Sequence, residues 1–502
     1  MPQRLTRLLG WLSLLFLVGG ALAFVGAFLT TQYLFQEPAF VTWSRLLKPE
    51  IRWQRQKYPS VRFAFDILEK VLVREDPRDR FGPTGNRPPP SEPSLWTADF
   101  VGPRVSGAAL SQTREGDLVI VQQADELKRA LRTARPGTTI LLRPGRYRFS
   151  GRSIEIDRPG DPAQPILLRA AALGDVTLQF DLLEGFHVRA PYWVFENLII
   201  EGVCRRDARC EHAFHIVGKA RGTVLRNNWI KNFNAAVKVN GARGSLPDGG
   251  LIEHNLFINE NPRDTDNPVT TLDIVAVSAW RVRKNVIAAF AKRRGDRTSY
   301  GAFFKGAGSG NVFEQNLIRC EWRHRGGIRV GFSFGGGGSS QRACRDARCD
   351  AEQQGGILRS NIIMNCPNDV GVYLNKSAGT SIHNNLIVNT RGIDVRFSES
   401  DAVIVNNVID GRVLARDGGS FSADRNIMDV LDALLLRRTS ADIYADPARG
   451  DFRLQDLDRI LGKGLPLENA GADLCDRPYS RGLTDIGPIQ YGLATACTPV
   501  LP

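Results

Sequence analysis

The residues best suited to chemistry are cationic, and they gather in one stretch of the chain. Residues 293–338 contain Lys305, the run Arg323, His324 and Arg325, then Arg329 and a run of glycines. A lysine among other cations has a lowered pKa, which suits a general base, and glycines let a ligand approach the backbone. Neighbouring arginines would bind and stabilise negative charge. This combination is suited to acid–base chemistry on an anionic ligand, with His324 as a further acid or base.

A second group of polar side chains follows in residues 369–399. It combines acids, bases and hydrogen-bonding side chains in the segments DVGVYLNKSA and GIDVRFSES, namely Asp369, Tyr373, Asn375, Lys376, Asp394, Arg396 and Glu399. Paired carboxylates carry out glycoside hydrolysis, and acids beside bases would also suit an epimerase. A stacked structural ladder of salt bridges would use the same residues, so these interpretations stay open.

A recurring pattern indicates the elements that must position these residues. A short β-rich run, a turn, and then Asn followed by two or three apolar residues occurs nine times, with the Asn at Asn197, Asn228, Asn255, Asn285, Asn316, Asn361, Asn385, Asn407 and Asn426. An imperfect period of this length is typical of a solenoid. The β-branched repeat predicts coils of short strands, and therefore an all-β solenoid of the parallel β-helix type. Asn tolerates left-handed backbone and bonds to its stacked copies, so we expect these residues to be architectural.

Two coils align without a gap and define a register. The segments that start at Ala213 and Val370 match position for position, and the coils around Lys305 and Arg396 join them with a one-residue allowance. Counting back from the repeated Asn places Lys305, Asn375 and Arg396 at one equivalent position. Because side chains alternate along a strand, we expect these three on one face of one sheet.

Both ends of the repeat region have signals of their own. Residues 124–134 predict an amphipathic helix that covers the open strand edges of the first coil, and RPGTTILLRPGRYRF follows as the first strands. Together with the N-N-L-I coils and the ending ADPARGDFRL…DIGPIQYG, these segments resemble right-handed parallel β-helix proteins of the pectate-lyase-like superfold over roughly residues 115–492. The resemblance implies the fold, whereas the superfold includes lyases, hydrolases, epimerases and non-catalytic spikes.

The cationic stretch has a narrower resemblance. Lys305, the following coil NVFEQN and the run from Arg323 to Arg325 resemble chondroitinase B and the related alginate lyases. That resemblance implies that Lys305 is the base and that Arg323 or Arg325 is the arginine on the acid side. The relatives have paired acidic calcium ligands five and seven residues before the lysine, where this chain has Tyr300 and Thr298. No cofactor is evident, calcium dependence stays open, and no metal ligands are assigned.

Charge narrows the class of partner. The 502 residues have a formal net charge of +13, which favours an anionic partner. No known nucleic-acid motif accompanies that charge, so we expect no nucleic-acid binding. The predicted partner is an acidic polysaccharide.

The eight cysteines fit an exported, oxidising compartment. Cys204 and Cys210 flank one short loop, and Cys344 and Cys349 flank a similar one, which predicts two disulfides with a metal site as the alternative. We expect Cys475 and Cys497 to form a disulfide that holds the C-terminal tail. Cys320 and Cys366 are expected to be stacked thiols in the core.

The N-terminal segment predicts a membrane anchor. Residues 8–36 have no charge, and residues 8–29 are almost continuously apolar, which is enough to cross a bilayer as a helix. Arg4 and Arg7 precede the run, so the N-terminus should be cytoplasmic and the main domain exported to a periplasmic or extracellular space. A cleaved signal peptide is the alternative. The expected regions are residues 1–33 as N-terminus and transmembrane helix, 34–100 as juxtamembrane region and Pro-rich linker, 101–492 as β-helix and 493–502 as tail.

These features predict a membrane-anchored, envelope-facing, carbohydrate-active β-helix protein, a polysaccharide lyase that cleaves a uronate polymer by β-elimination. The expected catalytic residues are Lys305, Arg323, Arg325 and His324, and the expected substrate-binding residues are Arg329, Asn375, Lys376, Arg396, Asp394 and Tyr373. Two alternatives stay open. One is a non-catalytic β-helix that binds polysaccharide or scaffolds an envelope assembly, and the other is a uronate epimerase or glycoside hydrolase.

Overall fold

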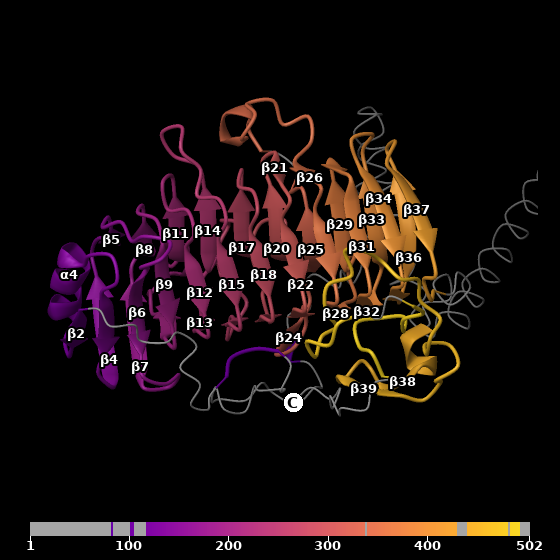
Figure 1. The fold of residues 1–502 in the computed structure, drawn as a ribbon, viewed down its shortest axis with the longest axis horizontal. Helices are drawn as coiled ribbons and strands as arrows, with labels where there is room; N and C mark the ends of the chain where they lie inside the picture. Colours follow the sequence, from indigo (N-terminus) through magenta and orange to yellow (C-terminus); the bar gives the residue numbers. More distant parts are fainter. Residues whose placement is uncertain are drawn as a thin grey trace, which may run out of the picture. The chain divides into compact units, whose positions relative to one another are not determined.

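Three long parallel sheets wind around one apolar core (Figure 1). The computed structural model describes residues 82–83, 101–104, 117–336, 339–428, 439–479 and 482–491. From the second turn onward, each coil adds one strand to each sheet, and each strand pairs in parallel with its equivalent in the next coil. The described chain is a right-handed parallel β-helix, as the sequence predicts.

The three sheets are numbered I to III. Sheet I has twelve strands: β2 (Leu118–Val121), β3 (Thr139–Leu142), β6 (Ile166–Ala170), β9 (Trp193–Glu196), β12 (Val224–Arg226), β15 (Leu251–Glu253), β18 (Arg281–Arg283), β22 (Val312–Glu314), β27 (Ile357–Arg359), β31 (Thr380–His383), β34 (Asp401–Val405) and β37 (Ser420–Asp424). Sheet II has ten: β4 (Gly145–Ser150), β7 (Val176–Asp181), β10 (Ile199–Gly202), β13 (Trp229–Lys231), β16 (Leu256–Ile258), β19 (Val286–Ala288), β23 (Leu317–Arg319), β28 (Ile362–Cys366), β32 (Leu386–Thr390) and β35 (Val408–Ile409). Sheet III also has ten: β5 (Ile154–Ile156), β8 (Glu184–Val188), β11 (His212–Val217), β14 (Val237–Asn240), β17 (Val269–Val275), β20 (Thr298–Lys305), β25 (Ile328–Phe334), β29 (Val372–Asn375), β33 (Gly392–Arg396) and β36 (Arg412–Arg416).

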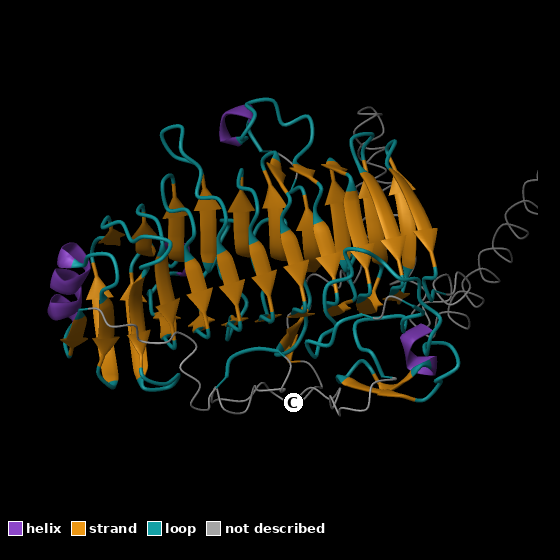
Figure 2. Ribbon diagram, in the orientation of Figure 1, coloured by secondary structure: helices purple, strands orange, loops and turns teal. Residues whose placement is uncertain are grey.

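Short strands complete the fold. A small parallel sheet joins β21 (Gly308–Ser309), β26 (Gln353–Gln354) and β30 (Ser377–Ala378), and antiparallel pairs join β1 (Gly82–Pro83) to β24 (His324–Arg325) and β38 (Tyr444–Asp446) to β39 (Asp451–Leu454). The helices among the described residues are α4 (Ala124–Thr133) and the short 3₁₀ turns η4 (Asp207–Arg209), η5 (Gln341–Ala343) and η6 (Thr439–Asp442) (Figure 2).

Identical positions of successive coils stack inside the solenoid. In sheet II the fully buried column runs Ile200, Ile230, Phe257, Ile287, Ile318, Ile363, Ile387 and Ile409. Such columns remove apolar area from water at every coil, which stabilises the fold by about 25 cal/mol per Å². The β-branched runs of the repeat motif therefore form the core.

The repeated Asn forms a buried ladder between sheets I and II. In each step the backbone N–H and the side-chain amide donate to the side-chain oxygen of the next Asn, at 2.8–3.1 Å. The predicted architectural role is confirmed from Asn228 to Asn426. The left-handed backbone belongs to the preceding residue, for example His254 at φ 55° and Lys284 at φ 55°.

The first repeat departs from this pattern. Asn197 itself adopts φ 61° and accepts a hydrogen bond from Asn227, the residue before the first ladder Asn. Leu198 takes the ladder position and donates its N–H to Asn228. Including Asn197 in the ladder was therefore wrong, because its motif is shifted by one residue.

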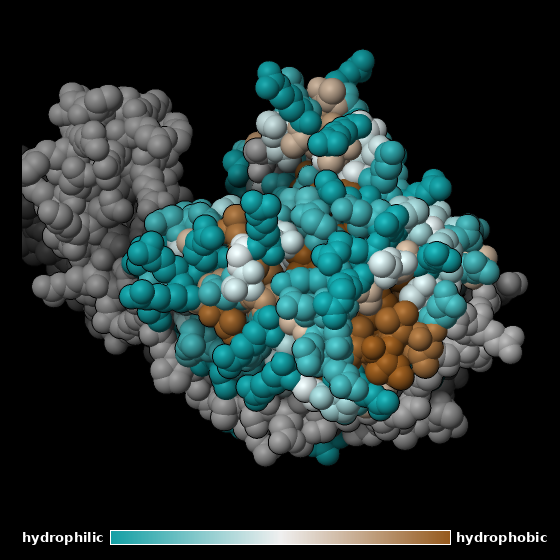
Figure 3. Space-filling model, turned by 90° about the vertical axis from the view of Figure 1, so that its left-hand side faces the viewer, coloured by the Kyte–Doolittle hydropathy of each residue, from teal (hydrophilic) through white to brown (hydrophobic). Residues whose placement is uncertain are grey.

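The helix α4 covers the first coil, as predicted. Leu127, Ala130 and Leu131 are buried, and Glu126 accepts the N–H of Gln123 at the helix start. At this end of the solenoid β2 has exposed apolar side chains, with Leu118 56 % and Ile120 46 % accessible. Figure 3 faces this end and shows apolar patches among hydrophilic surface.

The leading and final described segments pack along the corner beside the Asn ladder. Gly102 donates its N–H to the carbonyl of Lys284, whose Nζ bonds to Asp476 at 2.5 Å. Further along, Gln315 donates to the carbonyl of Asp473 at 2.6 Å. These segments cover a second apolar cluster that includes Ile362, Tyr444 and Phe452.

Sheet I carries a ladder of alternating charges on its outer face. Arg169, Glu196, Arg226, Glu253, Arg283, Glu314 and Arg359 occupy paired positions on successive strands. Arg226 bonds to Glu253 at 2.6 Å and Arg359 to Glu314 at 2.6 Å. Some of the arginines of the chain therefore serve to join the strands of sheet I.

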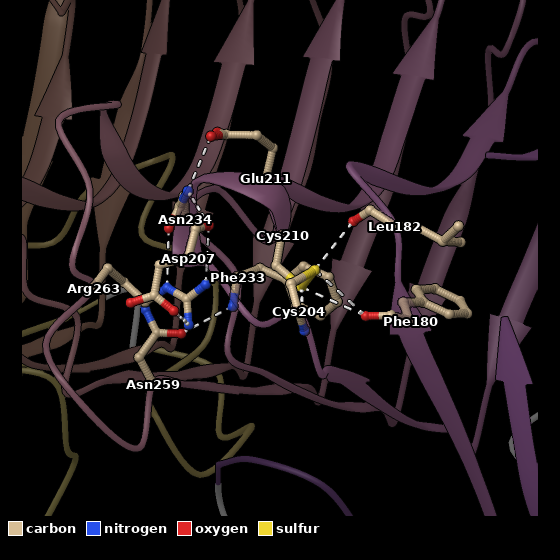
Figure 4. Close-up of a disulfide and its surroundings, with 10 residues drawn as sticks. All are labelled: Phe180, Leu182, Cys204, Asp207, Cys210, Glu211, Phe233, Asn234, Asn259 and Arg263. Atoms are coloured by element: carbon tan, nitrogen blue, oxygen red, sulfur yellow. Dashed lines mark hydrogen bonds and ion pairs between the residues drawn. A yellow bond between two sulfur atoms is a disulfide. The ribbon is translucent and has the colours of Figure 1, made fainter. Parts of the chain in front are cut away.

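The disulfides differ in part from the sequence expectation. Cys204–Cys210 and Cys344–Cys349 are bonded as predicted, and Figure 4 shows the first beside an Asp207–Arg263 ion pair of 3.1 Å. Cys320 and Cys366 are also bonded to each other, so the expectation of stacked thiols was wrong. They meet because β23 and β28 are neighbours, a pairing hidden by their separation of 46 residues. Cys475 is disulfide-bonded too, whereas Cys497 lies outside the described residues.

The predicted anchor, residues 8–29, lies outside the described residues, as do residues 34–100 apart from Gly82 and Pro83 and the tail after residue 491. In the part of the chain that the structure describes, no helix has the length and apolar character needed to cross a bilayer. The described residues all fall in one unit, Phe81–Pro502. The region boundaries drawn from the sequence stay predictions.

Candidate functional site

The outer face of sheet III collects most of the polar side chains singled out in the sequence. Two rows cross its strands at successive outward positions. The inner row is Lys238, Asp273, Phe303, Ser333, Tyr373 and Asp394. The rim row, two residues nearer the strand ends, is Val275, Lys305, Gly335, Asn375, Arg396 and Arg416.

The rim row confirms the register counted from the repeat. Asn375 pairs directly with Arg396. Lys305 reaches the same row through Gly335, because Phe304 pairs with Phe334 and Phe334 pairs with Leu374. At about 4.8 Å per strand, Lys305 and Asn375 are separated by roughly 10 Å along the solenoid.

Lys305 is a half-buried lysine that rests on an aromatic ring. Its Nζ lies 4.5 Å from the centroid of the Phe303 ring, and no described carboxylate forms an ion pair with it. Burial lowers the pKa of Lys305 below its usual 10.5; the charge of Asp273 opposes this shift, and Lys238 adds to it. Such a lysine is suited to accept a proton.

An inserted loop forms a wall beside Lys305. The chain between β25 and β26 rises from the strand ends of sheet III (Figure 1). A Cβ on Gly336 would lie 2.8 Å from Cδ of Lys305, so this glycine permits close contact. Buried Glu352 accepts the N–H of Gly306 at 2.8 Å, and Arg345 bonds to Asp248 at 2.8 Å. These contacts hold the loop against the lysine strand.

Tyr373, Asn375 and Arg396 form a polar cluster. The hydroxyl of Tyr373 accepts hydrogen bonds from Nδ2 of Asn375 at 3.1 Å and from Nη1 of Arg396 at 3.3 Å. The guanidinium of Arg396 also lies 4.4 Å from the centroid of the Phe397 ring. An amide, a phenol and a stacked guanidinium match the hydroxyls, rings and carboxylates of an acidic sugar.

The remaining cations of this face are paired. Arg396 bonds to Asp417 at 2.5 Å, and Lys376 bonds to Glu399 at 2.8 Å. Arg416 binds Asp394 in a bidentate manner at 2.6–2.9 Å. A polyanion would bind here by exchanging with these carboxylates.

Two half-buried acidic groups, Tyr300 in β20 and Asp369 just before β29, lie along sheet III. Burial raises the pKa of Asp369 above its usual 3.8, and Asp394 adds to the increase. Burial raises the pKa of Tyr300 to about 12, and the charge of Asp369 acts in the same direction. Burial thus disfavours the charged form of both groups.

The other cationic residues lie at the opposite end of sheet III. His324 and Arg325 form β24, which pairs with β1 before the strand β25 begins, whereas Lys305 ends β20. The strand β20 alone spans roughly 20 Å at about 3.3 Å per residue, so Arg323, His324 and Arg325 do not join Lys305 in one site. Nε2 of His324 contacts the carbonyl of Glu260 at 3.0 Å.

Arg329 is placed as a structural residue. It is 2 % exposed and donates to the carbonyls of Gly326 and His324 at 2.9 and 2.8 Å, as well as to that of Cys320. These bonds hold the turn between β23 and β25. The sequence did not reveal that Arg329 holds this turn. The length of the turn between β23 and β25 decides which carbonyls the side chain reaches, and no sequence motif marks that length.

The sequence analysis also missed several residues that surround Lys305. Phe303 alternates with Lys305 on the strand, and the glycine run supplies Gly336, so both were readable in principle. Glu352 was not readable, because it contacts Gly306 across a sequence separation of 46 residues that includes the inserted loop. A separate group of His and Glu residues at metal-ligand spacing lies on the first coils of the same face.

Comparison with solved structures finds β-helix enzymes at low identity. Pectate lyase Pel9A is 13 % identical, covers 75 % of this chain and 97 % of its own, and has a TM-score of 0.49. A PL6 family polysaccharide lyase from Pseudopedobacter saltans is 16 % identical over 67 % of this chain and 96 % of its own, with a TM-score of 0.33. An alginate lyase from Paenibacillus sp. str. FPU-7 is 15 % identical over 62 % and 94 %, with a TM-score of 0.32. No protein-family model and no curated protein sequence matches the chain.

These likenesses concern the fold and carry no inference about the reaction. The paired sheets define the class directly: the chain is a right-handed parallel β-helix protein with a polar, partly cationic face on sheet III.

Proposed function

We propose that this protein is a carbohydrate-active β-helix that binds an acidic polysaccharide along the outer face of sheet III and cleaves it by β-elimination, with Lys305 as general base. The observation that carries the proposal is the environment of Lys305, whose half-buried ammonium rests on Phe303 without an ion-pair partner among the described residues. Ionisable groups whose pKa is perturbed by burial and by specific charged neighbours occur frequently at functional sites.

The rim row suits an extended polymer. Asn375, Arg396 and Arg416 follow one another at the spacing of the strands, about 4.8 Å per coil, and Lys305 lies two strands before Asn375, with Gly335 between them. A chain of uronate units lying along this row would meet a cation or an amide at most coils. Electrostatic attraction from the net charge of +13 supports the same class of ligand.

The proposed reaction assigns one task to each group. The neutral Nζ of Lys305 takes the proton from the carbon next to the uronate carboxylate. The bond between the adjacent carbon and the glycosidic oxygen breaks, a carbon–carbon double bond forms, and the leaving oxygen takes a proton from water. Asn375 and Arg396, about 10 and 14 Å from Lys305 along the solenoid, bind the carboxylates of neighbouring units and hold the polymer on the rim row.

The test is an assay for the unsaturated product. Purified protein is incubated with polymers of mannuronate, guluronate, galacturonate and glucuronate, and ultraviolet absorbance is followed. We expect product from at least one polymer, and loss of at least a hundredfold of that rate in Lys305→Met, the lower end of general-base contributions. Lys463→Met, which removes an exposed charge in the final described segment, is the matched control.

A non-catalytic polysaccharide-binding protein is the second candidate, and one observation favours it. Arg323 and Arg325 lie at the other end of sheet III, so the lysine–arginine pair implied by the lyase resemblance is not assembled. Binding of a polymer without unsaturated or hydrolysed product would support this candidate and contradict the lyase.

Membrane anchoring and an envelope location belong to the same proposal. The uncharged residues 8–36 behind Arg4 and Arg7 support a single crossing with the β-helix exported. Fractionation of cells that express the full chain, followed by alkaline extraction, tests it. Full-length protein should stay with membranes and be cleaved by external protease, whereas a chain starting at residue 34 should be released.

A further inference from the structure

The first coils of sheet III carry a group of imidazole and carboxylate side chains. Glu184 and His187 lie on β8, and His215 lies directly opposite His187 on β11. The two rings stack with centroids 5.3 Å apart and planes at 28°. This group is separate from Lys305, because β14 and β17 lie between β11 and β20.

The candidate ligand atoms of these three residues converge. One atom each from Glu184, His187 and His215 lies within 4.8 Å of the other two. Around an ion about 2.0–2.2 Å from each N or O ligand, tetrahedral ligand atoms lie about 3.4 Å apart. The side chains must therefore close in on the ion for all three to bind it.

His215 has a buried nitrogen that makes no aligned hydrogen bond. Its Nδ1 lies 3.0 Å from Oε1 of Glu184, an ion pair when the ring is protonated, although the contact is not aligned as a hydrogen bond. Its other nitrogen, Nε2, contacts Oδ1 of Asn240 at 2.9 Å. Two electron-rich atoms directed at one point, with the far ring nitrogen held by an amide oxygen, is the arrangement expected of a metal-binding imidazole.

The ring of His187 is also held by a hydrogen-bond partner behind it. Its Nδ1 contacts both carboxylate oxygens of Glu155 at 3.1 Å, which leaves the second ring nitrogen for an ion. Arg189 bonds to Glu155 at 3.3 Å and to Asp157 at 2.8 Å, so the supporting carboxylate is itself held in place. A carboxylate behind the histidine orients the ring and increases its basicity.

The backbone around the group is constrained. The loop closed by the Cys204–Cys210 disulfide ends just before β11, and Glu211 donates its N–H to the carbonyl of Leu183 at 3.0 Å. Figure 4 shows Glu211 close to this disulfide. His212 lies beside the group, with its ring centroid 5.4 Å from that of His215.

We propose that Glu184, His187 and His215 bind a divalent transition-metal ion of the Zn²⁺ class, with water completing the coordination. Two imidazoles and one carboxylate suit Zn²⁺ better than Ca²⁺ or Mg²⁺, which prefer oxygen ligands. Three protein ligands on an outward face leave a position open, which is the pattern of zinc sites that exchange a ligand. The site does not depend on the function proposed for Lys305.

The experiment measures metal binding by the full chain, purified without a histidine tag. Isothermal titration with ZnCl₂, and equilibrium dialysis followed by elemental analysis, should give one ion per chain. His187→Ala and His215→Ala should each abolish stoichiometric binding. Glu155→Gln, which alters only the supporting carboxylate, should weaken it about ten- to a hundredfold. His324→Ala, on β24 and several coils away from β11, is the matched control and should bind like the unaltered protein.

Absence of a stoichiometric ion in the unaltered protein overturns the proposal, and so does full binding by the His187→Ala/His215→Ala double variant. Folding of each variant is checked by circular dichroism. X-ray absorption of the zinc-loaded unaltered protein identifies the ligands of the ion, and this measurement does not depend on whether a variant folds. A shell with two imidazoles supports the site, whereas sulfur or all-oxygen ligation contradicts it.

Discussion

Lys305 owes its character to the residues around it. Burial over the Phe303 ring lowers its pKa, and the two nearest charges on the inner row act in opposite directions, with Asp273 raising the pKa and Lys238 lowering it. Because Asp273 also binds Lys238, this ion pair controls the electrostatic potential at the lysine. The pair is therefore a means of testing the chemistry without touching Lys305.

We predict that Asp273→Asn lowers the pKa of Lys305 further. The substitution removes a negative charge that favours the ammonium and leaves the positive charge of Lys238. The neutral amine is then present at lower pH, so its acylation rate rises at lower pH. Mass spectrometry of the Lys305 peptide after brief acetylation across a pH series measures the shift. Asp451→Asn, which removes a carboxylate paired with Arg453 on β39, is the control; a shift to higher pH contradicts the prediction.

We predict that Arg396→Lys weakens binding of a uronate polymer by about tenfold. Lysine keeps the charge but loses the planar group that bonds to Tyr373 and Asp417 and stacks on Phe397. Affinity electrophoresis or titration with the polymer measures the change. Arg449→Lys in the final described segment is the control, because its side chain is largely exposed; equal affinities for both variants would exclude Arg396 from the binding face.

The sequence predicts one part of the site and not another. The position shared by Lys305, Asn375 and Arg396 was readable, because the Asn motif marks the same corner in every coil. The positions of Arg323 and Arg325 were not readable, because the turn between sheets II and III varies in length and no motif marks it. His187 and His215 did have a signal, since Phe-His recurs at the same position of the segments GFHV and AFHI, one coil apart.

At the scale of elements, the Asn ladder links each coil to the next through buried hydrogen bonds. Asn316 donates to Asn361 at 3.1 Å and to the carbonyls of Val282 and Glu314 at 2.9 and 2.8 Å. Its oxygen accepts the N–H and the amide of Asn285 at 2.9 and 3.0 Å. All of these groups are buried. The ladder therefore joins the coils and also supplies hydrogen-bond partners for the buried polar groups at the corner of each coil.

We predict that Asn316→Ala is strongly destabilising. Each buried group left without a partner costs about 1–3 kcal/mol, so the loss in the free energy of unfolding should exceed about 3 kcal/mol. Asn426→Ala, at the last rung, where the side chain is only partly buried, should cost clearly less. Urea unfolding followed by tryptophan fluorescence compares the two. Equal losses would show that the ladder acts through local turns and not through stacking.

At the scale of the whole described chain, the fold is stabilised along one corner by distant segments. Arg104 and Asn227 exchange hydrogen bonds of 2.5 and 2.9 Å near the beginning of the solenoid. Asn406 and Leu465 exchange two of 2.9 Å near its end. Solenoids gain most stability from neighbouring coils, and these long-range contacts couple coils that do not touch.

Two histidines at this corner give the protein a stability that depends on pH. Burial lowers the pKa of His254 from 6.5 to about 4, and burial likewise lowers that of His383 to about 4. His254 contacts the carbonyl of Gly102 at 3.2 Å, and His383 is next to Asn384, which donates to the carbonyl of Gly487 at 3.4 Å. Charging either ring would therefore disturb a covering segment.

Because both pKa values are lower in the folded state, the unfolded chain binds more protons between pH 6.5 and about 4. The stability linked to each histidine is fully present above pH 6.5 and is lost as pH falls to about 4, by roughly 3 kcal/mol for each ring at about 1.36 kcal/mol per pKa unit. We predict that the urea midpoint falls steeply over this range. The His254→Gln/His383→Gln double variant should show a much flatter dependence, whatever its stability at neutral pH. Identical slopes would mean that carboxylates, and not these buried rings, control the acid response.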